Sequence, residues 1–246
     1  MKVLVLAAGY GTRLYPIIKD TAKALLAING KPLINYILDR IRNLNGLNEV
    51  IVVTNNKFYN QFVDWSKKLE VPYKVTIVND KTDTPETRLG SIGDIHFTLD
   101  NYPIKDDLLV VGGDNLFDYN VEEYVLFAQK KNAAAIGLYD IGNLEEAKLF
   151  GVVAIDADRK VTLFEEKPAQ PKSTLIAMCF YYLPAHLLGS VAQYLHECKT
   201  ADKAGDYIKW LYKQTDVFGF KFTGTWYDIG SVESYYEAQK RFGVTK

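Results

Sequence analysis

The strongest constraint on this chain is an apolar run near its start that breaks abruptly into glycines. Val3–Ala8 is followed by Gly9 and Gly11. This order predicts a buried strand that ends in a tight loop, because glycine tolerates positive φ and lets another group approach the backbone closely. Successive N–H groups in such a loop can bind an anion. The pattern therefore favours an α/β fold with an anion site at the end of its first strand.

Two cations follow the glycines, Arg13 and Lys23. They supply charge where backbone dipoles alone are too weak to hold a phosphate chain. The loop is not a dinucleotide fingerprint, because Leu14 stands where that motif needs a third glycine. Gly30-Lys31-Pro32 is not a P-loop, because proline replaces the hydroxyl residue. A purely steric turn is the alternative explanation for the glycines, and we interpret the segment as a nucleotide site.

Several short segments stand at fixed spacing between Leu6 and Ile34. These are Leu6-Ala7-Ala8-Gly9-Tyr10-Gly11-Thr12-Arg13-Leu14, Pro16, Ala22-Lys23-Ala24-Leu25-Leu26 and Lys31-Pro32-Leu33-Ile34. Together they resemble the signature of the sugar-1-phosphate nucleotidylyltransferases, in particular glucose-1-phosphate thymidylyl- and uridylyltransferases. The one departure in this stretch is Ala22, where the family usually has a proline that would help to aim Lys23. The resemblance implies catalytic roles for Arg13 and Lys23, and nucleotide binding by Ala8, Gly9, Gly11 and Thr12.

Composition excludes several other classes of protein. With 246 residues, 48% of them hydrophobic and 24% charged, the chain can bury the core of one large α/β domain. A net charge of −1 argues against nucleic-acid and membrane-surface partners. Only Cys179 and Cys198 occur, which argues against a disulfide framework and favours a cytoplasmic location. No apolar stretch has the length of a transmembrane helix.

Short apolar runs alternate with amphipathic stretches over the first part of the chain. Such alternation predicts parallel β-α-β units with right-handed crossovers. The later part has shorter strands separated by turn residues. Strands are expected over 3–8, 49–54, 73–78, 107–112, 133–139, 151–155, 161–166 and 175–183, and helices over 33–42, 59–69, 90–99, 121–131, 185–196, 206–213 and 232–242.

We therefore expect a Rossmann-like, open and mostly parallel sheet flanked by helices, with a mixed sugar-binding half. The resemblance implies the nucleotide-diphospho-sugar transferase type of this fold. A single domain is expected over 1–246, with a nucleotide-binding half over about 1–132 and a sugar-phosphate-binding half over about 133–246. The sequence ends soon after the last expected helix, so no repeat-built acyltransferase domain is expected.

Asp114 follows the fourth apolar run and a pair of glycines. Ligands bind at the carboxyl edge of such sheets, and Mg²⁺ prefers hard oxygen ligands. From the residues alone, a capping or turn role for this aspartate is an equal alternative. In the family that the chain resembles, a Gly-Asp motif here and a later Trp-x-Asp-x-Gly motif supply metal ligands. The resemblance thus implies that Asp114 and Asp228, from Trp226-Tyr227-Asp228-Ile229-Gly230, share Mg²⁺.

Phe150-Gly151-Val152 and Glu165-Glu166-Lys167-Pro168 match family segments that line the sugar-phosphate pocket. On composition alone, a Glu-Lys pair usually lies on a solvated surface. The resemblance implies that Gly151 admits the sugar ring, Glu166 accepts hydrogen bonds from its hydroxyls and Lys167 meets its phosphate. It also implies that Gly90 lies near the base. The run Arg88-Leu89-Gly90-Ser91-Ile92-Gly93-Asp94 departs from the family and leaves the base open.

Together these features predict Mg²⁺-dependent nucleotidyl transfer to a sugar 1-phosphate, with release of pyrophosphate. Both reactants are anions, so positioning and electrostatics should dominate catalysis. UTP or dTTP with a hexose 1-phosphate is the favoured pair. Guanylyl or cytidylyl transfer to a mannose- or heptose-type or non-sugar phosphate, a catalytically silent sugar-nucleotide sensor and a nicotinamide-dependent enzyme are the alternatives. A homodimer is a further expectation that the aromatic content permits without requiring it.

Overall fold

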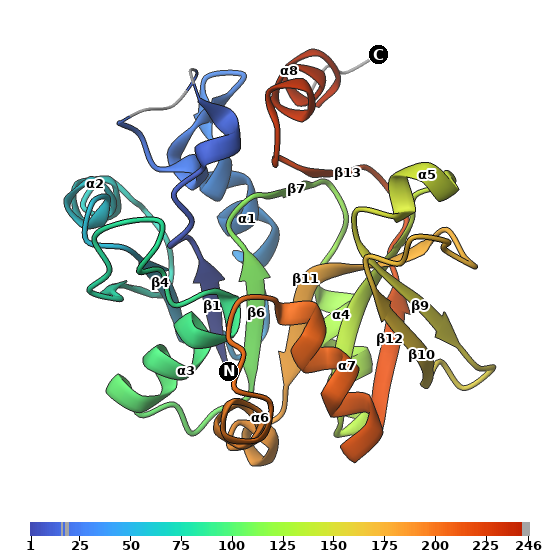
Figure 1. Cartoon of the computed structure of the whole chain (residues 1–246). Coiled ribbons are helices and arrows are strands. Elements are labelled where there is room, and N and C mark those ends of the chain that lie inside the picture. The colour runs from blue at the N-terminus through green and yellow to red at the C-terminus, as the bar shows by residue number, and fades with distance from the viewer. Residues whose placement is uncertain (16, 18–19, 243–246) are drawn as a thin grey trace.

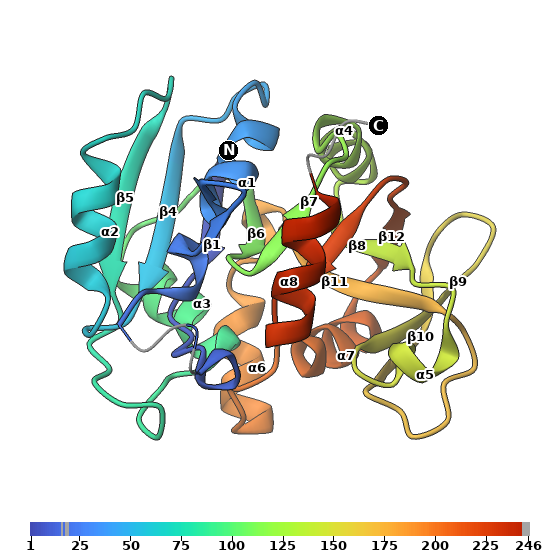
Figure 2. The same cartoon turned by 90° about the horizontal axis from the view of Figure 1, so that it is seen from above.

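A nine-stranded sheet runs through the computed structural model, which describes residues 1–15, 17 and 20–242. Pro16, quoted above for the glycine-loop signature, lies outside the described residues. Figures 1 and 2 show the sheet from two directions. Its strands run in the order β10 (Val161–Glu166), β9 (Gly151–Ile155), β11 (Leu175–Leu183), β6 (Leu108–Gly112), β1 (Lys2–Leu6), β4 (Glu49–Thr54) and β5 (Lys74–Asn79), and β8 (Ala134–Asp140) joins β11 to β12 (Val217–Lys221).

The strands of the first half are parallel and those of the second half are mixed. β1 pairs in parallel with both β4 and β6, and β4 with β5. β11 runs antiparallel to β6, β8 and β9. The parallel connections contain α1 (Leu33–Ile41), α2 (Tyr59–Ser66) and α3 (Ser91–Asn101), as crossovers between parallel strands require. The expected fold class is confirmed.

Helices cover both faces of the sheet, and this explains the unbroken apolar strands. In β1, Val3 and Val5 face the core formed with α1, α2 and α4 (Glu122–Lys131). Leu4 faces the opposite core, formed with α3, α6 (Ser190–Cys198) and α7 (Ala204–Gln214). Strands buried on both faces have continuous apolar sequences, because neither side of the pleat meets water.

Short elements bring the end of the chain back to the centre of the sheet. The ribbon β7–β13 pairs Asn115–Phe117 with Trp226–Asp228, antiparallel. Helix α8 then begins after Ser231, whose Oγ accepts a hydrogen bond from the Ser234 N–H. The remaining short elements are η1 (Thr12–Leu14), η2 (Lys23–Leu25), β2 (Ala27–Ile28), β3 (Lys31–Pro32), α5 (Leu144–Ala147), η3 (Ala185–Leu187) and α8 (Val232–Arg241).

The structure differs from the expected elements in a few places. The first strand ends at Leu6 rather than Ala8, and the helix expected over 185–196 is divided into η3 and α6. β12 was not expected, because Gly219 at its centre weakens the strand pattern. The β7–β13 ribbon is too short to give a periodic signal. Within the described part of the chain, no helix has the length and apolar character needed to cross a bilayer.

Candidate active site

A cavity of about 600 Å³ lies at the carboxyl ends of β1 and β6 and continues to β9, β10 and β11. This volume is in the range of small-molecule sites. The lining combines backbone of the glycine loop with charged side chains. It includes every site residue expected from the sequence: Ala8, Gly9, Gly11, Thr12, Arg13, Lys23, Gly90, Asp114, Gly151, Glu166, Lys167 and Asp228.

The glycine loop is held in place by a buried polar side chain. Asn55, which follows β4 and is fully buried, donates its Nδ2–H to the carbonyl of Ala8 at 2.8 Å. Gly11 has the left-handed conformation expected, with φ 64°. Gly9 does not, but no atom lies within 4 Å of where its Cβ would be. Glycine at this position leaves open space above the loop.

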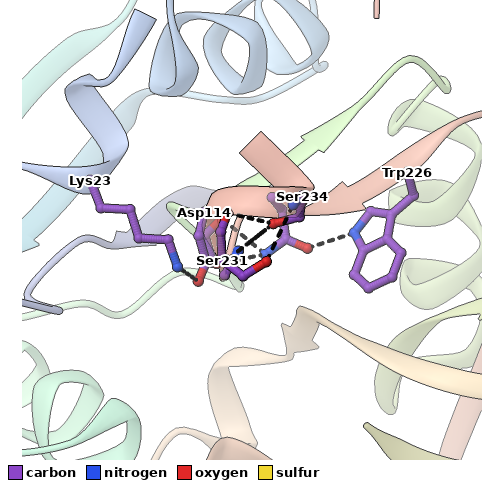
Figure 3. A network of polar contacts seen from close by, with 8 residues as sticks. Lys23, Asp114, Trp226, Ser231 and Ser234 are labelled. Carbon is purple, nitrogen blue, oxygen red and sulfur yellow. Dashed lines mark hydrogen bonds and ion pairs between the residues drawn. The ribbon is translucent and has the colours of Figure 1, made fainter. Parts of the chain in front are cut away.

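Lys23 is held in the cavity beside an acidic side chain. Its Nζ lies 2.7 Å from Oδ2 of Asp114 (Figure 3). Ala22, which replaces the family's proline, has φ −59°, a value that proline itself would impose. The Ala22 N–H, which proline lacks, donates to Oε1 of Gln61. The structure therefore aims Lys23 without proline, and Gln61 is a supporting residue that the sequence did not indicate.

Asp114 is oriented by a chain of hydrogen bonds. Asn115 donates its Nδ2–H to Oδ1 of Asp114 at 3.0 Å, and Trp226 donates its indole N–H to Oδ1 of Asn115 at 2.7 Å (Figure 3). Asn115 is 2% exposed. Sequence reasoning assigned no role to Asn115, although it directly follows Asp114.

Asp228 is brought beside Asp114 by the β7–β13 ribbon. The N–H of Ile229 donates to the carbonyl of Asp114 at 2.9 Å. Burial and the charge of Asp114 raise the pKa of Asp228 to about 6, against the opposing effect of Lys23 and Arg13. For Asp114, burial opposes ionisation but Lys23 outweighs it, so the pKa of Asp114 is lowered.

The two carboxylates fit a divalent cation such as Mg²⁺. Oδ1 of Asp228 is buried and has no hydrogen-bond partner among the described residues. In the same part of the chain, no group of three or more His, Cys, Asp or Glu side chains is arranged to hold a metal. Mg²⁺ is commonly held by one or two carboxylates together with water and substrate phosphates. Asp114 and Asp228 match that donor set.

Arg13 comes from η1 and extends toward the same carboxylates. Its Nη2 lies 3.4 Å from the point where a Cβ on Gly230 would be. It also lowers the pKa of Asp228, although less than burial raises it. The cationic groups of the glycine loop and of Lys23 therefore converge on one region of the cavity.

The far end of the cavity is built around Glu166. A Cβ on Gly205 would lie 2.0 Å from Oε2 of this side chain, so glycine at 205 makes room for the carboxylate. A Cβ on Gly151 would lie 2.5 Å from the Phe164 ring. Glycine at 151 is thus required by protein packing, whereas the sequence interpretation explained it by a sugar ring. Burial raises the pKa of Glu166, and Lys167 only partly offsets this effect.

Gly90 lines the cavity but is also constrained by a distant segment of the chain. It has φ 79°, and its Cβ would lie 2.5 Å from Cα of Asp202. The N–H of Ser91 donates to the Asp202 carbonyl, and the N–H of Ile92 donates to the Ala201 carbonyl. The segment 201–202 therefore covers the first turn of α3, which the sequence did not predict.

Comparison with known proteins identifies the family. Residues 2–243 match the model of the nucleotidyl transferase family. The chain belongs to this family. It is 28% identical over 240 residues to the bifunctional protein GlmU of Methanocaldococcus jannaschii, covering 98% of the chain and 54% of GlmU. It is 29% identical over 250 residues to the glucose-1-phosphate adenylyltransferase of Thermosipho africanus, covering 96% and 60%.

The chain therefore spans about half the length of the curated relatives it matches. Among solved structures, a UDP-glucose pyrophosphorylase in complex with UDP-glucose has the same fold, with a TM-score of 0.82 and 23% identity, covering 98% of this chain and 97% of that one. The family and these relatives confirm the resemblance to sugar-1-phosphate nucleotidylyltransferases.

Proposed function

We propose that this chain transfers a nucleotidyl group from a nucleoside triphosphate to a sugar 1-phosphate. The observation that carries the proposal is the common location of three sets of residues. The glycine loop with Arg13 and Lys23, the carboxylates Asp114 and Asp228, and the pair Glu166 and Lys167 all line one cavity. Membership of the nucleotidyl transferase family supports this chemistry.

The reaction forms a bond between a phosphate oxygen of the sugar 1-phosphate and the α-phosphorus of the triphosphate. The bond from the α-phosphorus to the bridging oxygen breaks, and pyrophosphate leaves with the bonding electrons. Both reactants carry negative charge, so their repulsion must be reduced before they can approach. In this proposal Arg13 stabilises charge on the α-phosphate and on the leaving pyrophosphate, while Lys23 orients the phosphates of both reactants.

The sugar phosphate binds at the other end of the cavity in this proposal. Lys167 meets the attacking phosphate as a compact positive charge. Glu166 accepts hydrogen bonds from sugar hydroxyls, and the packing of Phe164 against Gly151 sets the wall next to it. The carboxylates Asp114 and Asp228 hold Mg²⁺, which when bound neutralises negative charge on the triphosphate.

We propose UTP or dTTP with a hexose 1-phosphate as the substrates, the pair that the glycine-loop signature favours. The test measures pyrophosphate release with Mg²⁺ across ATP, CTP, GTP, UTP and dTTP and a panel of sugar 1-phosphates. The expected result is release that needs one class of nucleotide and one sugar phosphate. Release with GTP or CTP instead would retain the reaction and replace the nucleotide.

Two variants connect this activity to the cavity. Arg13→Ala and Asp114→Asn should each lower turnover about 100-fold or more, the scale measured for loss of one charge-stabilising contact. Asp64→Asn is the matched control, because Asp64 is exposed on α2 and pairs only with Lys67 among the residues that the structure describes. Folded Arg13→Ala protein with more than about a tenth of normal turnover would contradict the role of Arg13. Nucleotide binding without release from any pair of substrates would favour a sensor.

A further inference from the structure

Two buried carboxyl groups at the glycine-loop end of the cavity have no part in the proposed reaction. Asp80 directly follows β5 and is 3% exposed, and Asp94 lies in the first turn of α3 and is 6% exposed. Each of the two carboxyl groups alters the pKa of the other. Asp94 lines the cavity. Isolated acidic side chains are rarely buried this far, so the pair calls for a functional explanation.

The hydrogen bonds of this pair are unequal. Asp80 accepts from both the N–H and the Oγ1–H of Thr82, at 2.7 and 2.8 Å. Oδ1 of Asp94 is buried and has no partner among the described residues. Leaving a buried acceptor unpaired is costly, and such atoms in native proteins are few. Because Asp94 lines the cavity, a ligand that brings a hydrogen-bond donor can pair with its carboxyl group.

Thr82, the hydrogen-bond partner of Asp80, also connects the two aspartates to the glycine loop. Oγ1 of Thr82 lies 3.2 Å from the hydroxyl of Tyr10, which is buried in that loop. Asp94 therefore belongs to the end of the cavity where the nucleotide binds in the proposed function. Under that proposal, a donor that reaches Asp94 comes from the nucleotide and not from the sugar phosphate near Glu166.

The distribution of charge in the cavity indicates which part of a nucleotide would bind next to Asp94. Arg13, Lys23 and Lys167 all lower the pKa of Asp228. The positive charges of the cavity therefore lie near Asp114 and Asp228. The negative charge that the pair Asp80 and Asp94 shares would repel a phosphate. Burial and the charge of Asp80 raise the pKa of Asp94 to about 8, so that near neutral pH it is a neutral acid. An uncharged donor, as found on a nucleoside, matches its carboxyl group.

We propose that Asp94, held in place by Asp80, accepts a hydrogen bond from a ring N–H of the nucleobase and thereby contributes to the choice of triphosphate. Uracil, thymine and guanine carry such an N–H on their base-pairing edge. Adenine and cytosine have an acceptor nitrogen there, which would leave both acceptors unpaired. This inference rests on the proposed function and names the nucleotide class: triphosphates of bases with a ring N–H.

The test measures binding by calorimetry with the full chain and Mg²⁺, without sugar phosphate. The probes are ATP, CTP, GTP, UTP and dTTP, with pyrophosphate as a probe of the phosphate region alone. We expect the natural chain to bind one or more of UTP, dTTP and GTP best. Asp94→Leu, which removes the acceptor that asparagine would retain, should reduce its preference for that nucleotide over ATP and CTP about tenfold or more, because sites built around a hydrogen bond discriminate strongly. Pyrophosphate affinity should not change.

Asp83→Asn is the matched control. It removes a negative charge that raises the pKa of Asp80, but Asp83 is exposed and does not line the cavity. We expect it to leave the order of nucleotide affinities unchanged. A second comparison needs no variant of the protein. N3-methyl-UTP, which lacks the ring N–H, should bind at least about tenfold more weakly than 5-methyl-UTP, which gains a methyl group elsewhere and keeps it.

Several outcomes would overturn the inference. These are equal losses for all five nucleotides in folded Asp94→Leu protein, a natural chain that prefers ATP or CTP, and equal affinities for the two methylated nucleotides. If pyrophosphate release from a substrate pair persists while these results are found, only the role of Asp94 fails. A chain that binds none of the five nucleotides overturns both this inference and the proposed function.

Discussion

Asp114 and Asp228 are neighbouring side chains of the same kind whose pKa values shift in opposite directions. Burial disfavours the charged form of both. Lys23 forms an ion pair with Asp114, at 2.7 Å, and this contact outweighs burial there. Asp228 instead experiences the negative charge of Asp114 at a buried position. The placement of one lysine thus decides which of the two carboxylates is firmly ionised.

A first prediction concerns Asp94 and the pH dependence of stability. Its pKa is raised from the ordinary value of 3.8 to about 8 by burial and by Asp80. Between these values the native state binds a proton that the unfolded state has lost, so the free energy of unfolding falls as pH rises. Asp94→Asn removes this titration and should flatten the fall by up to about 1.4 kcal/mol per pH unit. Urea unfolding at a series of pH values between 5 and 8 measures it.

The control for this prediction is Asp83→Asn, which removes an exposed carboxylate from the same neighbourhood. It should leave the slope of the natural chain nearly unchanged. Equal slopes for Asp94→Asn and the natural chain would mean that Asp94 is ionised in the native state, contrary to our interpretation.

At the scale of single residues, the sequence predicted side chains that stand in fixed motifs. Arg13, Lys23, Asp114 and Asp228 were assigned in this way, and the structure gathers them in one cavity. It could not predict partners that come from distant segments. Gln61, for example, supports the residue before Lys23 across 39 positions of sequence, and no local pattern encodes such a contact.

At the scale of elements, the β7–β13 ribbon controls the orientation of the acidic pair. Trp226→Phe keeps the aromatic packing but removes the indole N–H that Asn115 accepts. Because Asn115 is buried, the loss should reduce the free energy of unfolding by about 1–3 kcal/mol. Turnover should fall as well, since Asn115 also donates to Asp114. Chemical unfolding and pyrophosphate release measure the two effects.

Trp210→Phe is the matched control for this change. The Trp210 indole N–H donates to Glu197 at an exposed site on α7, away from the cavity. It should have a smaller effect on stability and none on turnover. Equal effects of the two tryptophan substitutions on turnover would argue against a role for the ribbon in orienting Asp114.

The first turn of α3 offers a second prediction at this scale. Gly90→Ala and Gly142→Ala both place alanine at positive φ, at 79° and 69°. Only Gly90 is close to other backbone, with Asp202 Cα and the Ala201 carbonyl oxygen within 2.6 Å of the new Cβ. Gly142→Ala should cost about 1–2 kcal/mol, and Gly90→Ala about 1–3 kcal/mol more. Equal losses in urea unfolding would indicate that the segment 201–202 moves aside freely.

Elements of the sheet and its covering helices were predictable, because their side-chain spacing directly reflects burial. β1, β4 and β6 are mainly apolar, with polar residues only at the ends of β1 and β4, since both faces are covered. The ribbons are different. Residues 115–117 pair with residues 226–228, which are distant in the sequence, and three residues give no period to detect.

At the scale of the whole molecule, a bound nucleotide should stabilise the fold. A ligand that binds only the native state at 100 times its Kd adds about 2.7 kcal/mol. For a chain of this length, that corresponds to a rise in Tm of about 5–10 °C. Thermal unfolding with the preferred triphosphate and Mg²⁺ should show this rise in the natural chain and in Asp64→Asn. No rise with any of five triphosphates would contradict nucleotide binding at this cavity.

The sequence predicted the fold class of the whole molecule, since alternating strands and helices leave few topologies open. It did not predict the order of the strands in the second half. β12, the penultimate strand of the chain, pairs with β8, and β11 lies between β8 and β6. Such pairings join residues far apart in sequence, and the apolar pattern of a buried strand is the same beside any neighbour.

The nine residues of β11 have one more consequence, which concerns how the molecule can move. This strand is hydrogen-bonded to β6 in the first half of the chain and to β8 and β9 in the second half. A hinge rotation of one half against the other would have to break these ladders. Any adjustment to substrates is therefore confined to segments that lie outside the sheet.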